Sequence, residues 1–348
     1  MTKTFTKSDS MAAKGMAILL LLLYHLFHET WILEELRVNY APIPQDLFLM
    51  VSEFGNICVA VFVMITAYGI TKSIMSAPDM AIAESYRQAG KRFWKLLGSF
   101  ALLYLSVILI WFYKFDLGSL YGEGKQGILL LLCDAAGLAS YFDSPTLCET
   151  WWYMPLAYAL IFLIPLLAFC YKKMGNTLLL AGFFVPMIVT LNSDMQRYFF
   201  VAVMGVCAAG GDWFGKLFSR NISAVLKWLV GIVGFVLCIL IRQNAVVKDY
   251  FFDYVDAPVA FFVICFTVML PGTVPGIKQF LGFVGKHSMY IFLVHTFFYM
   301  ILFRGFIYQF KYAGITYVLL LATSLGYAVV LNYVRVLLAK LVKMIKKS

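Results

Sequence analysis

The chain has 348 residues, of which 62% are hydrophobic and only 13% are charged. A soluble domain is about 45–50% apolar and about 25% charged, so this composition excludes a soluble protein and predicts one integral membrane domain. The net charge of +10 does not indicate a nucleic-acid partner, because the lysines and arginines lie in short clusters between long apolar runs.

Ten apolar runs are predicted to cross the lipid bilayer as helices, since a helix of about 20 residues spans the roughly 30 Å hydrocarbon core. In chain order they cover residues 12–28, 54–74, 92–113, 150–170, 177–191, 197–211, 226–242, 255–271, 283–304 and 315–341. The runs at 177–191 and 197–211 are short, so their boundaries are the least defined. We therefore expect an all-α polytopic fold.

The predicted domain organisation is simple. Residues 1–11 form a short cytoplasmic tail, 12–342 a single ten-helix transmembrane domain, and 343–348 a basic cytoplasmic tail. The apolar stretch 127–141 contains Asp134 and is predicted to be re-entrant or interfacial, because an eleventh crossing would place the C-terminal lysines outside.

Charge orients these spans. With the N-terminus inside, the inner segments hold 20 of the 28 basic residues, and the outer segments hold 14 of the 18 acidic residues. This asymmetry follows the positive-inside rule, so both termini are predicted to be cytoplasmic. We therefore expect a multi-pass protein of the plasma membrane, and the basic inner loops suit a bacterial membrane best.

The seven cysteines are scattered and show no metal-finger spacing. Cys133 and Cys148 fall in one predicted outer segment and could form a disulfide, although most cysteines in such proteins are small apolar fillers. His28 and Glu29 could supply two ligands of a metal site, but no other span offers a third ligand. No metal is expected.

The first span carries two ionisable residues, Lys14 and His25. Eleven residues at about 100° each return to within about 20° of the starting direction, so both side chains share one helix face, roughly 16 Å apart along the axis. An ionisable group at membrane depth is costly and points to function. The alternatives are a snorkelling lysine and a buried neutral imidazole bonded to a helix carbonyl.

Later segments add further candidates. His295 lies near the middle of the ninth span, where a helix-packing hydrogen bond is the alternative to a functional role. Arg92 and Lys95 share a helix face at the inner start of the third span, with Lys91 beside them, and such cations hold phosphate unless they only orient the helix. Trp152 and Tyr153 begin the fourth span as an aromatic belt or a sugar-stacking platform.

Short patterns in a fixed order carry a family resemblance. They are Lys14 with ten residues before His25, Thr66-Ala67-Tyr68, Arg92-Phe93-Trp94-Lys95, Trp152-Tyr153-Met154, and Gly285-Lys286-His287-Ser288 leading through Tyr290 to His295. Together they resemble the acyltransferase 3 family, integral membrane enzymes that move acyl groups, usually acetyl, from acyl-CoA onto exported glycans and other acceptors. Lys14 and Lys95 replace family arginines, and Thr66-Ala67 replaces Ser-Gly.

The resemblance implies an O-acyltransferase that uses acyl-CoA, most often acetyl-CoA, and a hydroxyl acceptor such as a glycan. We expect His25 to act as general base, assisted by Lys14 and His295, because imidazole titrates near neutral pH. Arg92, Lys95 and Lys91 are the expected cofactor-binding cations, and the expected acceptor-binding side chains are Trp152, Tyr153, Tyr68 and Tyr290.

Two other classes fit the same composition. A transporter or flippase for a glycan or organic anion also suits midplane histidines and the intramembrane prolines Pro155, Pro165 and Pro258, although the two halves show no matching pair of interrupted segments. A non-catalytic membrane sensor or scaffold is the third class, and it predicts that the deep histidines are dispensable.

Overall fold

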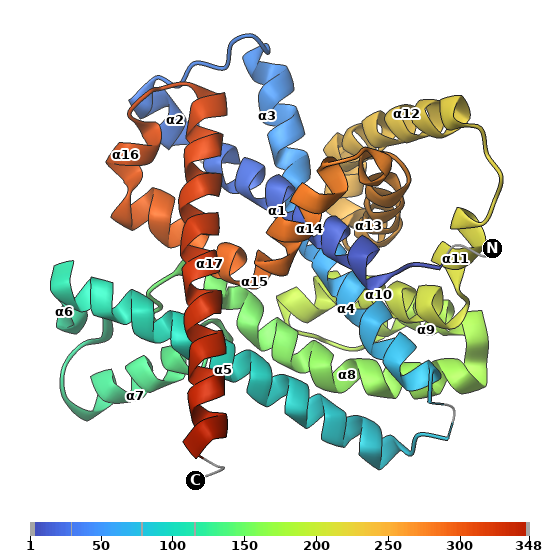
Figure 1. The fold of residues 1–348 in the computed structure, drawn as a ribbon, viewed down its shortest axis with the longest axis horizontal. Helices are drawn as coiled ribbons and strands as arrows, with labels where there is room; N and C mark the ends of the chain where they lie inside the picture. Colours follow the sequence, from blue (N-terminus) through green and yellow to red (C-terminus); the bar gives the residue numbers. More distant parts are fainter. Residues whose placement is uncertain (1–3, 29, 78, 115, 346–348) are drawn as a thin grey trace.

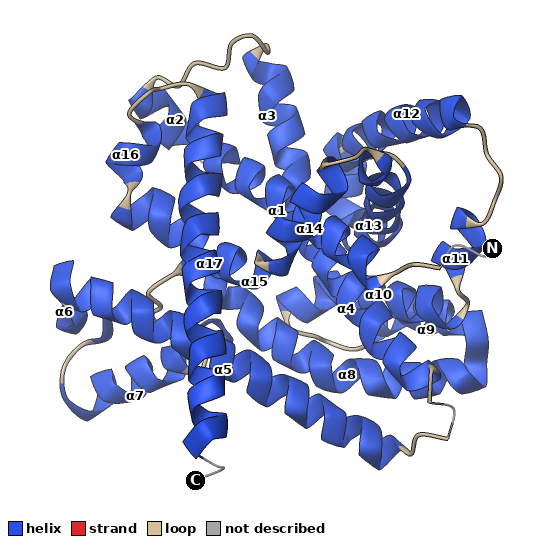
Figure 2. Ribbon diagram, viewed as in Figure 1, coloured by secondary structure: helices blue, strands red, loops and turns tan. Residues whose placement is uncertain are grey.

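The computed structural model describes residues 4–28, 30–77, 79–114 and 116–345, and it is built from helices (Figures 1 and 2). Within those residues the β-structure is a single isolated bridge between Asn39 and Tyr312. The longer helices are α1 (Lys7–His28), α3 (Gln45–Phe54), α4 (Cys58–Met75), α5 (Ile82–Lys114), α7 (Gly124–Ala135), α8 (Tyr153–Met174), α9 (Leu178–Ile188), α10 (Ser193–Gly210), α12 (Ala224–Gln243), α13 (Phe252–Met269), α14 (Ile277–Lys286), α15 (Ser288–Thr296) and α17 (Ala313–Ile345).

Short helical segments connect them. The short α-helices are α2 (Thr30–Leu36), α6 (Leu117–Tyr121), α11 (Trp213–Phe218) and α16 (Arg304–Tyr308). Single turns of 3₁₀ helix are η1 (Gly55–Ile57), η2 (Ala139–Phe142), η3 (Glu149–Trp152), η4 (Gly175–Thr177) and η6 (Pro271–Thr273), and η5 (Val247–Phe251) and η7 (Phe297–Leu302) are π-helical.

The all-α polytopic fold class predicted from the sequence is confirmed. Each of the ten predicted runs coincides with helical structure, but only seven segments of the described chain are long and apolar enough to cross a membrane. Three runs account for the difference. Helix α9, with 11 residues and about 17 Å of rise, is counted together with α8; α10 is not among the seven; and His287 divides the predicted run 283–304 into α14 and α15. The count of ten crossings stays a prediction.

Helix α1 lies in the centre of the molecule, with α14, α4, α13, α15 and α17 packed around it (Figure 1). Two glycines allow the closest of these approaches. A Cβ atom at Gly15 would collide with the backbone carbonyl of Leu281, and one at Gly285 would collide with the carbonyl of Met11. The absence of side chains at both positions therefore brings the start of α1 and the end of α14 into backbone contact.

The N-terminal boundary differs from the predicted tail 1–11, since α1 begins at Lys7. Asp9 accepts hydrogen bonds from Thr6 and forms a 2.7 Å ion pair with Lys278, and Phe5 stacks on Phe214. These contacts stabilise a first helical turn that is polar in sequence. At the other end α17 continues through Ile345, and residues 346–348 of the predicted basic tail lie outside the described residues.

The stretch 127–141, predicted to be re-entrant or interfacial, contains most of α7. Its apolar side chains Ile128 and Leu129 are exposed, as a helix lying against lipid requires, while Asp134 is buried. The Tyr121 hydroxyl and the Leu147 amide donate to the Asp134 carboxyl at 2.6 and 3.0 Å, yet burial raises its pKa. Its position in the interface remains a prediction.

Both outer cysteines are free thiols. The Cys148 thiol lies beside the Thr150 hydroxyl at 3.2 Å, and the Ser144 hydroxyl donates to the Cys133 sulfur at 3.7 Å. Burial raises the pKa of Cys148 to about 11, which makes it a poor nucleophile for disulfide exchange. The structure therefore does not contain the disulfide that the sequence left open.

Candidate active site

A pocket of about 190 Å³ lies between α1, α4, α5, α8 and α15; we call it the central pocket. Its polar lining comes from Lys14, Thr66, Tyr153 and Ser288, and the remaining lining is apolar, with Phe292 and Leu293 at one side. Because these helices come from distant parts of the sequence, the pocket exists only in the folded bundle. It is the feature that gathers predicted site residues most closely.

His25 and His295 meet one helical turn beyond Phe292. Their ring centroids are 4.8 Å apart and the rings are edge to face, with His25 in the last turns of α1 and His295 at the end of α15. His295 is fully buried, whereas His25 is partly exposed. The two histidines that the sequence placed in different spans therefore form one pair.

The hydrogen bonds of His295 define its tautomer. Its Nδ1 lies 2.7 Å from the carbonyl oxygen of Phe292 and 3.2 Å from that of Ile291. Since a carbonyl oxygen only accepts, Nδ1 carries the proton and donates, which leaves a lone pair on Nε2. The Thr296 hydroxyl lies 3.3 Å from Nε2. His295 is thus held by its own helix with one nitrogen able to accept a proton.

Trp151 supports the helix that carries His295. Its indole Nε1 donates to the carbonyl oxygen of Leu293 at 2.8 Å, and the Cys148 thiol lies 3.6 Å from the same oxygen. That carbonyl lies where α15 passes into the π-helical turn η7, whose altered hydrogen-bond pattern requires such partners. The turn η3 in this way fixes the end of α15.

Lys14 lines the central pocket from the inner half of α1. Among the described residues, none forms an ion pair or hydrogen bond with its ammonium group. Because α1 runs without a break from Lys7 to His28, Lys14 and His25 lie about 16 Å apart along its axis. A cation without a partner in a mostly apolar pocket favours binding of an anion.

The predicted cofactor-binding cations lie in the first half of α5, next to the pocket-lining residue Leu96. Lys91 and Lys95 are exposed, while Arg92 is half-buried and donates to the Ser73 hydroxyl at 3.3 Å. Its buried Nη1 has no hydrogen-bond partner in the described chain. Arg92 is therefore the one of the three with a sheltered, unused donor.

The predicted acceptor-binding aromatics separate into two groups. Tyr153 lines the central pocket and Trp152, its neighbour, stacks on Tyr198 at 6.4 Å. Tyr68 instead packs against Phe5, away from the pocket lining, and Tyr290 is buried in α15 without lining the pocket. The structure brings only one of the four into the central pocket.

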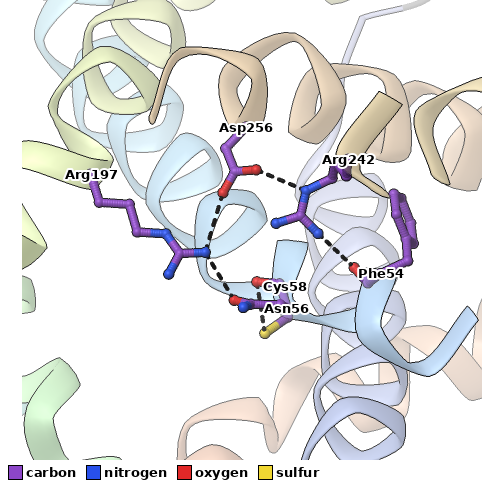
Figure 3. Close-up of polar contacts among 6 residues, drawn as sticks. All are labelled: Phe54, Asn56, Cys58, Arg197, Arg242 and Asp256. Carbon is purple, nitrogen blue, oxygen red and sulfur yellow. Dashed lines mark hydrogen bonds and ion pairs between the residues drawn. The ribbon is translucent and has the colours of Figure 1, made fainter. Parts of the chain in front are cut away.

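A second polar site was not singled out by the sequence analysis. Asp256, fully buried, lies between Arg242, 4% exposed, and Arg197, whose side chain is 27% exposed (Figure 3). Arg242 Nε donates to Asp256 at 2.9 Å, and Arg197 Nη2 lies 3.6 Å from the other carboxylate oxygen and 3.1 Å from Asn56 Oδ1. We call Arg197, Arg242 and Asp256 the arginine cluster.

One signal in the sequence pointed to this cluster. Arg197 and Arg242 are two of the eight basic residues in predicted outer segments, where the positive-inside rule disfavours them. Both lie at the ends of predicted spans, as does Asp256. Nothing in their spacing indicated that three separate helices bring them together.

The two sites differ in the chemistry that they support. The histidine pair offers a proton acceptor next to a pocket with a free ammonium group, which suits acid–base catalysis on an anionic substrate. No group of three or more His, Cys, Asp or Glu side chains arranged to hold a metal ion occurs in the described ranges.

Comparison with known proteins gives one result. The family model Acyl_transf_3, described as an acyltransferase domain, matches residues 11–334, which include every residue of the central pocket, the histidine pair and the arginine cluster. No curated protein and no solved structure matches the chain significantly.

Proposed function

The chain belongs to the acyltransferase 3 family, and from that premise we propose that it transfers an acyl group, acetyl in the first instance, from cytosolic acyl-CoA to a hydroxyl group of a cell-surface or exported glycan. Membership and the apolar helices make it a membrane acyltransferase. The observation that carries the finer proposal is the contact between His25 and His295 beside a pocket that contains Lys14.

The donor enters from the side of Lys14. The phosphates of acyl-CoA bind the cations at the inner end of the bundle, Arg92, Lys95 and Lys14, because oxyanions bind cationic donors. The pantetheine arm then runs along the central pocket, whose apolar lining suits it. The separation of about 16 Å between Lys14 and His25 gives the thioester access to the histidine.

His25 acts as general base. It removes the proton of the acceptor hydroxyl as the oxygen attacks the thioester carbonyl carbon, and the C–S bond breaks in the second half of the step. The CoA thiolate leaves and takes the proton from the His25 imidazolium. His295, whose Nδ1 is bound to its own helix, orients His25 or the acceptor through Nε2.

Release of free CoA thiol by the purified protein in lipid nanodiscs tests this proposal. Acetyl-CoA is supplied with and without a glycan extract, and wild type is compared with His25→Ala. General-base catalysis contributes about 10²–10⁴-fold, so we expect a loss of that size in the variant.

His28→Ala is the matched control, because His28 lies one turn further along α1 and is exposed. Full activity is expected for it. A folded His25→Ala variant with wild-type turnover would refute His25 as the base, and absence of acyl-CoA binding by wild type would instead favour a transporter.

A further inference from the structure

A second pocket, of about 180 Å³, opens beside the arginine cluster; we call it the polar pocket. Its lining consists of Glu53, Phe54, Asn56, Arg242, Gln243, Lys248 and Phe252. Ligand pockets of whole small molecules measure about 300–1,000 Å³, so this volume suits one polar group of a larger ligand. Nothing in the proposed catalytic step uses this pocket.

The arginine cluster has hydrogen-bond donors without acceptors. Arg242 uses Nε on Asp256 and Nη1 on the Phe54 carbonyl at 3.2 Å, but its buried Nη2 has no partner within the described residues (Figure 3). The buried Nε of Arg197 also has no hydrogen-bond partner within the described residues. A buried donor without a partner costs about 1–3 kcal/mol, more when it is charged.

The nearby carboxylates are already engaged. Asp256 faces both arginines, and Glu53 accepts from Lys248 at 2.7 Å and from Gln243 at 2.8 Å. Asp253 and Asp194 also lie near Arg197, beyond ion-pair distance. Asp256 Oδ2 lies 3.6 Å from Arg197 Nη2 and has no hydrogen-bond partner among the described residues, so the unpaired donors reflect the geometry of the cluster and not a shortage of negative charge.

The polar pocket adjoins the catalytic helix. Gly55, between the lining residues Phe54 and Asn56, packs so closely on α1 that a Cβ there would lie 3.0 Å from the Cβ of Tyr24. Tyr24 precedes His25 in the sequence. The segment that lines the polar pocket therefore packs on α1 at the residue that precedes the proposed base.

We propose that the polar pocket binds an oxyanion, a carboxylate or a phosphate group, that belongs to the acyl acceptor. Such a group supplies the missing acceptor oxygens to the guanidinium of Arg242, whose planar array of donors matches it. Phe252 and Phe54 enclose it on the apolar side. Placing the oxyanion on the acceptor rests on the proposed function, whereas the oxyanion site itself does not.

Binding is tested first, in detergent without phospholipid, by calorimetry with methyl glucuronoside and glycerol 3-phosphate as probes. Their neutral counterparts, methyl glucoside and glycerol, should bind at least about tenfold more weakly, the equivalent of one lost charge-assisted hydrogen bond. Equal binding of charged and neutral probes would overturn the proposal.

Asn56→Asp is the informative variant, because it places a carboxylate beside Arg197 and the pocket without removing a cation. We expect it to lose the preference for the anionic probes while its thermal stability stays at or above that of wild type. Arg197→Gln should weaken anion binding, and Arg304→Gln, another partly exposed arginine paired with a carboxylate, is the control that should not. Equal losses in both arginine variants would overturn the assignment.

Two further measurements separate the possible sources of the oxyanion. If methyl glucuronoside and methyl glucoside accept acyl groups equally well, the inference fails while the proposed function stands. In the second measurement, phosphatidylglycerol vesicles compete with the probes for the site. If they compete as strongly as the soluble anions do, the site binds a lipid headgroup, and the acyl acceptor is not the source of the oxyanion. A third outcome is that the wild-type protein binds anions, Asn56→Asp abolishes this binding, and no acyl transfer is detected. That outcome would support the oxyanion site and refute the proposed function.

Discussion

The central pocket and the arginine cluster both contain ionisable groups among packed helices, but only in the arginine cluster are these charges compensated by neighbouring side chains. Lys14 lines its pocket without a described ion-pair partner, and the histidine pair beside it contains no carboxylate. Asp256, in contrast, is buried between two guanidinium groups that also bond to the backbone of Phe54 and to Asn56.

This difference separates catalysis from stability. Groups whose charge is not compensated within the protein interact with a ligand when it arrives, so their loss should affect binding and turnover. Groups whose charge is compensated by buried neighbours hold helices together, and removal of one partner leaves the other charge without a counterion. In the arginine cluster the charges are compensated in this way, and only the unpaired donors Arg242 Nη2 and Arg197 Nε are proposed to serve a ligand. The comparison therefore predicts which substitutions unfold the protein and which only inactivate it.

The largest expected effect is on stability at the arginine cluster. Asp256→Ala leaves Arg242, 4% exposed, without its carboxylate, and breaking a buried pair costs about 3–5 kcal/mol. Thermal unfolding in detergent should show this as a marked fall in midpoint. Asp212→Ala, which removes a half-exposed pair with Lys72, should cost about 1 kcal/mol or less, and equal losses would contradict the comparison.

At the central pocket the expected effect falls on binding. Lys14→Gln removes the unpaired ammonium, and loss of a hydrogen bond to a charged group costs about 1.5–3 kcal/mol, or about 10–100-fold in the Kd for acetyl-CoA. Unfolding should stay near wild type. Lys7→Gln, an exposed lysine of the same helix, is the control, and the same loss of affinity in both variants would disprove a specific role for Lys14.

A smaller effect is expected where the backbone is fixed next to the histidine pair. Trp151→Phe keeps the aromatic ring but leaves the buried Leu293 carbonyl without its indole donor, at a cost of about 1–2 kcal/mol. Because that carbonyl belongs to the helix of His295, we expect turnover to fall several-fold with little change in KM. If a Trp152→Phe variant with the same loss of stability lost as much turnover, this positioning role would be wrong.

The smallest expected effect is a pH dependence outside both sites. Burial raises the pKa of Asp134, so the fold favours its protonated form, and its contribution to stability falls as pH rises from the usual value of 3.8 through the raised one. Asp134→Asn should flatten the pH dependence of the unfolding midpoint above the usual value of 3.8, relative to wild type. Asp143→Asn, at an exposed turn, should leave the profile unchanged.

Helix content and the shared helix face of Lys14 and His25 were within reach of the sequence, since apolar runs and the eleven-residue spacing in α1 are local patterns. The contact between His25 and His295 was not, and neither was the crossing count, because α9 ends at Ile188, α10 is not among the seven apolar spans and a break at His287 shortens another run. The arginine cluster joins residues 197, 242 and 256, which lie on three different helices. A single sequence carries no information on which helix ends meet.

The aromatic predictions illustrate the same limit. Tyr68 shares α4 with the pocket residue Thr66, yet two residues along a helix turn the side chain by about 200° to the opposite face. It packs there on Phe5, from a segment predicted to be a free tail. The motif Thr66-Ala67-Tyr68 identified the helix correctly. Which of its side chains faces the pocket depends on the helices packed around α4, and a short motif carries no information about them.

The backbone contact at Gly15 and Gly285 has a consequence for how the gene tolerates mutation. Every missense change at a glycine codon adds at least a Cβ, which at these positions meets a carbonyl of the facing helix. In a saturation library selected for function, both codons should therefore be depleted of all missense changes, alanine included. Gly69 and Gly282, whose added Cβ meets nothing within 4 Å, should accept alanine freely in the same library.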